Sequence, residues 1–422
     1  MNYRAIKGTK DILPSETPRW QFVEQTIRDV FHRFNYKEIR TPVFEQTSLF
    51  ARSIGELTDI VGKEMYTFVD RSEESITLRP EGTASVMRSY IQNNLGQEQP
   101  LAKVYYIGPM FRQERPQAGR LRQFHQFGAE ATGSPTPETD VEIIALALEI
   151  YKQLGITNYS LQINSVGDEE CRPKYKEILK TELRKIADKL SPESQKRIDQ
   201  NPMRVLDSKD ENDKALTAAM PLITDYLNEE CAEHFERVKK LLTEYGIPFT
   251  VNGRLVRGLD YYTKTAFEIT STELGSQDAL AGGGRYDLLI EELGGKKTPS
   301  VGFAAGMERL MMILEKKGFA APEPHPMIFI AVAEDSARDW VLKKTMELRS
   351  LGIAAETDLL RRSLKAQMKE ADRQGSTYAI VIGTTELEKG KGLLKHLSDH
   401  SQREVTLADL HQYIRNDGTN KT

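Results

Sequence analysis

The segment RGLDYY (257–262), together with GGGRYD (282–287), decides how the rest of the chain is interpreted. Each segment puts a permanent cation next to residues that suit a tight polar pocket. Glycine allows close approach of the backbone, and tyrosine supplies rigid walls that form hydrogen bonds. The two segments therefore predict a site for a nucleotide and a small polar substrate.

Further arginines and carboxylates extend this pattern. RPEGT occupies 79–83, and FRQER runs on through AGRLRQFHQFGAE to cover 111–130. A planar guanidinium can bind carboxylate or phosphate in a bidentate manner, so this density of arginine indicates chemistry on polyanions.

These four segments and VGFAAGMERL (301–310) closely resemble the motifs of the histidyl-tRNA synthetases, a family of class II aminoacyl-tRNA synthetases. The resemblance extends from TPVFE (41–45) into the C-terminal region, and RGLDYY and GGGRYD are peculiar to the histidine family. It implies a histidine-tRNA ligase, an enzyme that converts L-histidine and ATP to histidyl-adenylate and transfers histidine to the 3′ end of tRNA(His). It also implies Mg²⁺ with the ATP, and a homodimer.

The resemblance assigns catalytic roles to three arginines. Adenylate formation brings a carboxylate against the α-phosphate, so preorganised cations stabilise the charge that accumulates in the transition state. Arg112 is similar to the residue that contacts the α-phosphate and the substrate carboxylate, and Arg257 to one that faces the α-phosphate from the other side. Arg309 matches the residue around the adenine and γ-phosphate, and Glu114 and Arg120 complete the ATP set.

The histidine pocket follows from the same resemblance. Neutral imidazole presents one donor and one acceptor, so its recognition needs both kinds of partner. A pocket built on such hydrogen bonds can reject analogues by roughly 10⁴- to 10⁵-fold, and no editing module is apparent. The residues assigned to the ammonium group, the imidazole and the carboxylate side of histidine are Glu81, Thr83, Gln126, Glu130, Arg257, Tyr261 and Tyr262.

Two basic features are candidates for tRNA contacts. In the loop ERPQAGRLR (114–122), Gln117 matches a reader of the tRNA acceptor end, although a solvated hairpin tip is the alternative. Arg361, Lys365, Lys369 and Arg373 are four apart and predict a basic stripe on a helix, with an ordinary charged face as the alternative.

Composition sets limits on these hypotheses. The chain has 422 residues, enough for two or three domains, and a net charge of −4 that gives no general argument for nucleic-acid binding. Cys171 and Cys231 stand 60 residues apart without a CxxC motif, so the sequence predicts no disulfide framework and no protein metal motif. Neither a signal segment nor a membrane span is apparent, and we expect a soluble, cytoplasmic protein.

The pattern of elements predicts the α+β class. A helix is expected from Thr17 and Pro18, an edge strand over EIRTPVFE (38–45), two antiparallel hairpins over 65–82 and 101–131, and further strands at YSLQINSV, RLVRG, TAFEITS and DALAGGGRYD. These strands predict a broad, mainly antiparallel sheet with covering helices. The catalytic domain is expected over 1–320 with a helical insertion at about 169–248, and an anticodon-binding domain of alternating strand and helix over 326–422.

Two other functional classes fit parts of the sequence. The first is the catalytically inactive paralogue that regulates ATP phosphoribosyltransferase, which typically lacks motif residues and the anticodon domain. The second is a class II synthetase for another amino acid. The presence of Arg112, Arg257, Arg309 and Glu81, and of the two histidine-specific segments, favours the histidine enzyme.

Overall fold

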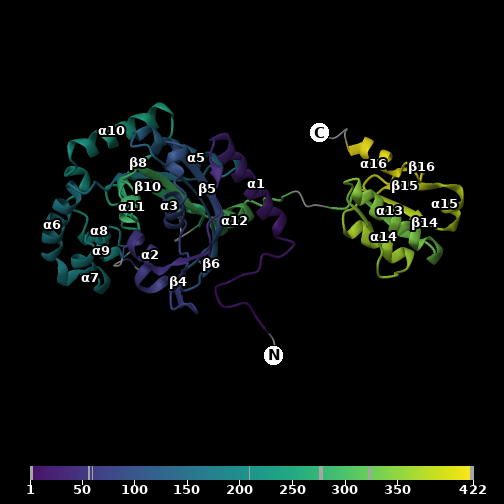
Figure 1. The fold of residues 1–422 in the computed structure, drawn as a ribbon, viewed down its shortest axis with the longest axis horizontal. Coiled ribbons are helices and arrows are strands. Elements are labelled where there is room, and N and C mark those ends of the chain that lie inside the picture. The colour runs from purple at the N-terminus through teal and green to yellow at the C-terminus, as the bar shows by residue number, and fades with distance from the viewer. Residues whose placement is uncertain are drawn as a thin grey trace. The chain divides into compact units, whose positions relative to one another are not determined.

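The computed structural model describes residues 3–55, 58, 60–208, 210–274, 279–321 and 325–418. The chain divides into two compact units, Met1–Ala321 and Pro322–Thr422. Figure 1 shows the elements of each.

An eight-stranded sheet forms the centre of the first unit. Its strand order is β1-β5-β6-β11-β10-β9-β7-β8, and all neighbours are antiparallel except β1–β5 and β7–β8. The strands are β1 (Lys37–Glu38), β5 (Ala102–Phe111), β6 (Gln123–Thr132), β7 (Ser160–Ser165), β8 (Thr250–Val251), β9 (Thr263–Thr270), β10 (Ala279–Arg285) and β11 (Ser300–Gly306). The predicted α+β class, with a mainly antiparallel sheet, is confirmed.

Helices cover one face of this sheet (Figure 1). The apolar residues Trp20, Val23, Ile27 and Val30 recur at helical spacing and are all buried, which confirms the predicted first helix. They join one core with side chains of the sheet and of three other helices. The helices of this layer are α1 (Thr17–Arg33), α5 (Pro137–Gln153), α10 (Glu229–Glu244) and α12 (Met307–Lys316).

The other face meets a second apolar cluster and the helices that follow β7. Within the predicted insertion, α6 to α9 join this cluster, whereas α10 packs on α5 and belongs to the first core. The helices that contribute to this cluster are α3 (Thr83–Gln92), α6 (Cys171–Arg184), α7 (Pro192–Gln200), α8 (Met203–Leu206), α9 (Glu211–Leu216) and α11 (Leu289–Glu292). Helix α2 (Thr47–Ile54) packs in a separate small cluster with Ile60 and Ala84, and α4 (Leu95–Glu98) follows α3 in the chain.

A small sheet of β2 (Phe44–Gln46), β4 (Ser75–Leu78) and β3 (Tyr66–Val69) lies beside α2. The antiparallel pairings β3–β4 and β5–β6 confirm both predicted hairpins. Two strand predictions are wrong. The stretch expected as one edge strand divides around Pro42 into β1 and β2, which join different sheets, and 254–258 forms no strand. Proline cannot donate a ladder hydrogen bond, so a break at Pro42 is natural.

The second unit contains a five-stranded sheet in the order β13-β12-β14-β15-β16. Its first three strands are parallel, as predicted, while the two C-terminal strands form an antiparallel extension that the sequence did not predict. The elements are β12 (Ile328–Val332), α13 (Arg338–Ser350), β13 (Ala355–Thr357), α14 (Leu364–Arg373), β14 (Tyr378–Ile382), α15 (Thr384–Lys389), β15 (Lys391–His396), β16 (Gln402–Thr406) and α16 (Leu410–Gly418).

The predicted basic stripe is shorter than expected. Arg361 precedes α14 and has a positive φ of 55°, so it does not continue the helical row. Arg373 forms an ion pair with Glu370, in agreement with an ordinary charged face at that end.

Candidate active site

A cavity of about 220 Å³ opens on the sheet face opposite the first core. Strand alternation places its polar residues there. Along β6, Phe127, Ala129 and Ala131 enter the helix-covered core, whereas Gln126 lies on the opposite side and lines the cavity. Loops and strand ends from β4, β5, β10, β11 and the 257–262 segment supply the remaining walls.

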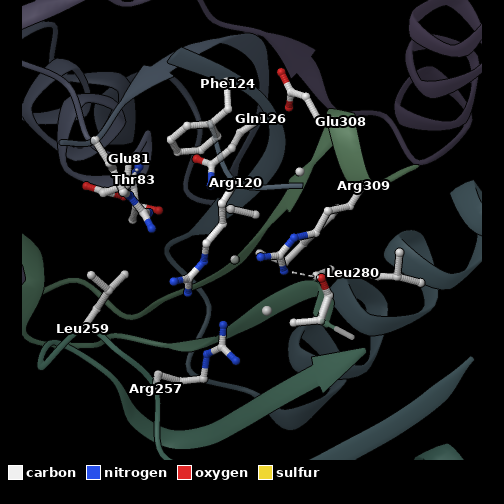
Figure 2. Close-up of a pocket in the computed structure, with 18 of the residues that line it drawn as sticks. Glu81, Thr83, Arg120, Phe124, Gln126, Arg257, Leu259, Leu280, Glu308 and Arg309 are labelled. Atoms are coloured by element: carbon white, nitrogen blue, oxygen red, sulfur yellow. Dashed lines mark hydrogen bonds between the residues drawn. The ribbon is translucent and has the colours of Figure 1, made fainter. Parts of the chain in front are cut away.

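The structure brings most of the predicted site residues into this one cavity. Figure 2 shows Arg120, Arg257 and Arg309 extending their guanidinium groups from different segments into the same space, with Glu81 and Thr83 on another wall. The predicted residues that line the cavity are Glu81, Thr83, Arg112, Glu114, Arg120, Gln126, Arg257, Tyr261, Tyr262 and Arg309.

Two predicted residues lie outside the cavity lining. Gln117 lines a neighbouring cavity with Trp20, His125 and Met312, on the other side of the Gly119–Leu121 stretch. Glu130 is fully buried and accepts a hydrogen bond from the hydroxyl of Thr83, at 2.7 Å, and another from Tyr286. It therefore contacts the side chains of two cavity residues, Thr83 and Tyr286, and lies behind them without lining the cavity itself.

Arg257 is held by one carboxylate and one glycine. Its Nη1 donates to Glu268 Oε1 at 2.6 Å. Glu268 lies on β9 directly opposite Gly282 of β10, and a Cβ on Gly282 would come within 1.6 Å of Arg257 Nη2. A side chain at position 282 would thus force the guanidinium to move. This explains, from sterics, why the glycine triplet accompanies the arginine.

Local contacts fix the other cations that line the cavity. Arg112 Nε donates to the carbonyl of Pro80 at 2.9 Å, and its guanidinium lies 5.3 Å from the ring centroid of Phe124. Arg309 Nη1 donates to the carbonyl of Ala279 at 2.6 Å (Figure 2). Glu114 forms an ion pair with Arg120 at 3.2 Å.

Glu81 and Gln126 bring buried acceptor oxygens to the cavity. Glu81 accepts hydrogen bonds from the backbone N–H groups of Thr83 and Ala84, at 2.7 and 2.9 Å. Burial nevertheless raises its pKa, because desolvation penalises the charged form. Gln126 Oε1 is buried and has no hydrogen-bond partner among the described residues. An acceptor in this position favours a ligand that donates hydrogen bonds.

Three tyrosines form the apolar wall. Tyr261 lies with its ring centroid 4.7 Å from that of Tyr262 and 5.5 Å from that of Tyr286. Tyr286, Phe124 and Glu268 were not assigned roles from the sequence. A sequence feature could have indicated each of two of them. Glu268 is a charged residue in the otherwise apolar and hydroxyl-bearing strand TAFEITS, and Tyr286 lies within the glycine motif GGGRYD.

The guanidinium of Arg285 in GGGRYD does not line the cavity, whereas Gly282 and Tyr286 of the same segment do. Arg285 is fully buried and pairs with Asp140, which also contacts His234 Nε2 at 3.2 Å. Burial alone would raise the pKa of the Asp140 carboxyl, but the Arg285 guanidinium and the hydrogen bond with His234 lower it to about 2. Arg285 thus anchors β10 to α5 and α10 and has a structural role.

The only candidate metal group among the described residues consists of Asp168, Cys171 and Cys231, whose ligand atoms lie within 4.8 Å of one another. Asp168 Oδ1 accepts from the backbone N–H groups of Glu170 and Cys171, and its Oδ2 from Asn228. These contacts account for the carboxylate as a partner of backbone N–H groups at the start of α6. Within the described ranges no helix is long and apolar enough to cross a membrane.

A mainly antiparallel sheet that gathers arginines and carboxylates in one cavity, as here, is the architecture of the class II aminoacyl-tRNA synthetases. Comparisons with known proteins define the family. The model of the "Histidyl-tRNA synthetase" family matches residues 8–310, and that of the "Anticodon binding domain" matches residues 327–417. The chain therefore belongs to the histidyl-tRNA synthetase family.

Similar proteins span the whole chain. It is 51% identical over 423 residues to a histidine-tRNA ligase of Chloroherpeton thalassium, with 99% of each chain covered. It is 50% identical to the corresponding ligase of Halothermothrix orenii, covering 97% of this chain and 98% of that one. The crystal structure of apo histidyl-tRNA synthetase from S. aureus superposes with a TM-score of 0.84 at 40% identity, covering 98% of this chain and 100% of that one.

Buried Glu130 gives a testable pH dependence. Burial, opposed by hydrogen bonds from Tyr286 and Thr83, raises its pKa to about 8. Between about pH 4.3, the pKa of an unfolded glutamate, and about pH 8, Glu130 holds a proton in the native state that it has lost in the unfolded state. The contribution of Glu130 to the free energy of unfolding therefore falls as the pH rises. Relative to Glu130→Gln, the wild-type free energy of unfolding should decline by up to about 1.4 kcal/mol per pH unit. Urea unfolding of both proteins from pH 5 to 9 tests this, and parallel profiles would contradict it.

Proposed function

We propose that this cavity carries out the two reactions of a histidine-tRNA ligase. The carboxylate of L-histidine attacks the α-phosphate of ATP, histidyl-adenylate forms, and pyrophosphate leaves. The terminal ribose hydroxyl of tRNA(His) then attacks the carbonyl of the adenylate, and AMP leaves. The observation that carries this proposal is the convergence of Arg112, Arg257 and Arg309 with a buried, acceptor-rich pocket in one cavity.

The arginines supply the charge that adenylate formation needs. Two anions must approach each other, and fixed guanidinium groups lower the barrier because they are oriented before the reaction. Arg257 and Arg112 act on the α-phosphate and the substrate carboxylate, while Arg309 holds the nucleotide together with Arg120. The contacts of Arg257 with Glu268, of Arg112 with Pro80 and of Arg309 with Ala279 support this, since each fixes the direction of the cation.

Histidine occupies the inner end of the cavity. Its ammonium group donates to Glu81, the hydroxyl of Thr83 and Gln126, and the orphan acceptor Gln126 Oε1 supports this placement. The imidazole lies against Tyr261 and Tyr262, with Glu130 completing its hydrogen bonds. Glu130 lies behind Thr83, so the bound imidazole reaches it only if the Thr83 or Tyr286 contact rearranges.

Mg²⁺ fits the outer part of the cavity. Carboxylate and phosphate oxygens are its preferred partners, and Glu114 offers a carboxylate beside the arginines that would hold the phosphates. The ion would neutralise phosphate charge and polarise the phosphoryl group. The chain's own arginines orient the reacting groups.

Two parts of the chain bind tRNA: the loop that carries Gln117, and the second unit. Gln117 lines a cavity next to the active site, where it reads the acceptor end. The anticodon-binding domain over 326–422 provides a second contact. Its family match and its separate compactness support this role. The ligase works in the cytoplasm, in line with its family.

The active enzyme is a homodimer. Apolar side chains are exposed around the small sheet, including Phe44 (51% exposed), Phe68 (48%) and Val69 (66%). Such a surface is typical of a subunit contact. Sedimentation equilibrium should give twice the chain mass, and replacing Phe44 and Val69 together by glutamate should weaken the association. A monomeric wild type at micromolar concentration would refute the dimer.

Direct detection of the intermediate tests the proposed function. Mixing the protein with ATP, Mg²⁺ and histidine should yield bound histidyl-adenylate and one equivalent of pyrophosphate, detectable by mass spectrometry and a coupled assay. Threonine in place of histidine is the matched control and should yield neither. Absence of adenylate with histidine would refute the assignment.

A further inference from the structure

The segment 257–262, which supplies Arg257 and both pocket tyrosines, lies between the sheet and helices α6 to α8. Figure 1 shows α6 to α9 as a group on one side of the first unit. A cavity of about 30 Å³ separates the two parts and is lined from both, with Arg172, Lys176, Asn201 and Met203 on the helical side.

Two polar contacts fasten the segment to these helices. On α6, the Arg172 guanidinium donates to the carbonyl of Tyr262 and, from Nε, to that of Val166 at 3.1 Å. Just after α7, Asn201 Nδ2 donates to Asp260 Oδ1 at 2.8 Å. Arg172 therefore binds the backbone of the pocket residue Tyr262, and Asn201 binds the side chain of Asp260.

The Asn201 contact stands out because the amide is only 8% exposed. Its Oδ1 has no hydrogen-bond partner among the described residues, so within that part of the chain the side chain is held by its bond to Asp260. An unsatisfied oxygen on a buried amide costs stability. The other end of the Asn201 amide is directed at Asp260.

Apolar packing joins the same two parts. Tyr261 and Tyr262 belong to one cluster with side chains of the helical region. The partners there are Tyr175, Leu179, Leu183, Ile198, Met203 and Val205. A displacement of these helices would therefore move the wall of the histidine pocket as well as its polar anchors.

We propose that helices α6 to α8 support the histidine pocket, with Arg172 and Asn201 as positioning residues that hold segment 260–262 so that Tyr261 and Tyr262 face the amino acid. Neither residue touches the substrate. This inference rests on the proposed binding of histidine in the cavity. It assigns to the helical region a role in amino-acid affinity that is separate from tRNA binding.

Steady-state ATP–pyrophosphate exchange tests it with the full chain and no tRNA. Asn201→Ala should raise the KM for histidine about 5-fold, the loss expected for one hydrogen bond, and leave the KM for ATP within 2-fold of wild type. Asn201→Asp should raise it at least as much, because two carboxylates then face each other. The double variant Asn201→Asp, Asp260→Asn again pairs an amide donor with a carboxylate acceptor. It should bring the KM for histidine most of the way back to the wild-type value.

Gln200→Ala is the matched control, since it removes an exposed amide from the end of the same helix. It should leave both KM values unchanged. An unchanged histidine KM in Asn201→Asp would overturn the inference. A double variant Asn201→Asp, Asp260→Asn whose histidine KM stays as high as that of Asn201→Asp would overturn it as well. Failure of the proposed function is distinguishable, because the wild type itself would then show no histidine-dependent exchange.

Discussion

Replacing Arg257 by alanine is expected to slow histidyl-adenylate formation about 10²- to 10³-fold, the typical effect of removing one preorganised contact to developing charge. Binding of histidine and ATP should weaken much less, because this cation is needed chiefly where charge accumulates at the α-phosphorus. Arg257→Lys should recover little, since a point charge cannot reproduce a planar fork held by Glu268. Single-turnover adenylation and equilibrium binding measure the two effects separately.

Two variants complete this test. Gly282→Ala leaves the arginine in place but brings a Cβ into the space of its guanidinium, so it should reproduce part of the defect. Arg184→Ala removes an arginine whose side chain is 61% exposed and pairs with Asp199, and it should leave the rate unchanged. Near-normal adenylation in folded Arg257→Ala would remove this residue from the chemistry.

Removal of residues 326–422 is expected to separate the two reactions. Histidine-dependent pyrophosphate exchange should survive at least in part, because the cavity is lined entirely by residues of the first unit. Charging of tRNA should fall steeply through lost phosphate and base contacts, and the tRNA affinity of the intact enzyme should weaken as salt rises. kcat/KM for tRNA and the association state of the truncated protein should be measured together. A dimeric truncated protein with unchanged kcat/KM would show that the second unit does not contribute.

Much of the fold follows from local patterns. The spacing of Trp20, Val23 and Ile27 predicted α1, and alternation predicted both hairpins, because burial of one face imposes its period on the sequence. Short elements were less predictable. β1 has only two residues and is defined by its parallel pairing with β5, a contact between distant segments that no local pattern encodes.

The site was predictable where residues act from within a motif. Arg112 follows β5, Arg257 lies in a loop and Arg309 lies in the first turn of α12, and all three reach one cavity from segments far apart in the chain. The sequence does not show why Arg257 lines the cavity whereas Arg285 does not, because both lie in motifs that contain glycine and tyrosine. The two arginines differ in position because they have different partners. Arg285 pairs with Asp140 in the core, whereas Arg257 pairs with Glu268 at the cavity. The Asn201–Asp260 contact was likewise invisible, because it joins residues 59 apart.

ATP–pyrophosphate exchange with each of the amino acids in turn tests the central claim most directly. The account predicts exchange with histidine alone, and an increase in the histidine KM for Glu130→Ala corresponding to roughly 1 to 3 kcal/mol, the cost of losing a buried hydrogen-bonding partner. Equal exchange with glycine, threonine or proline would contradict it.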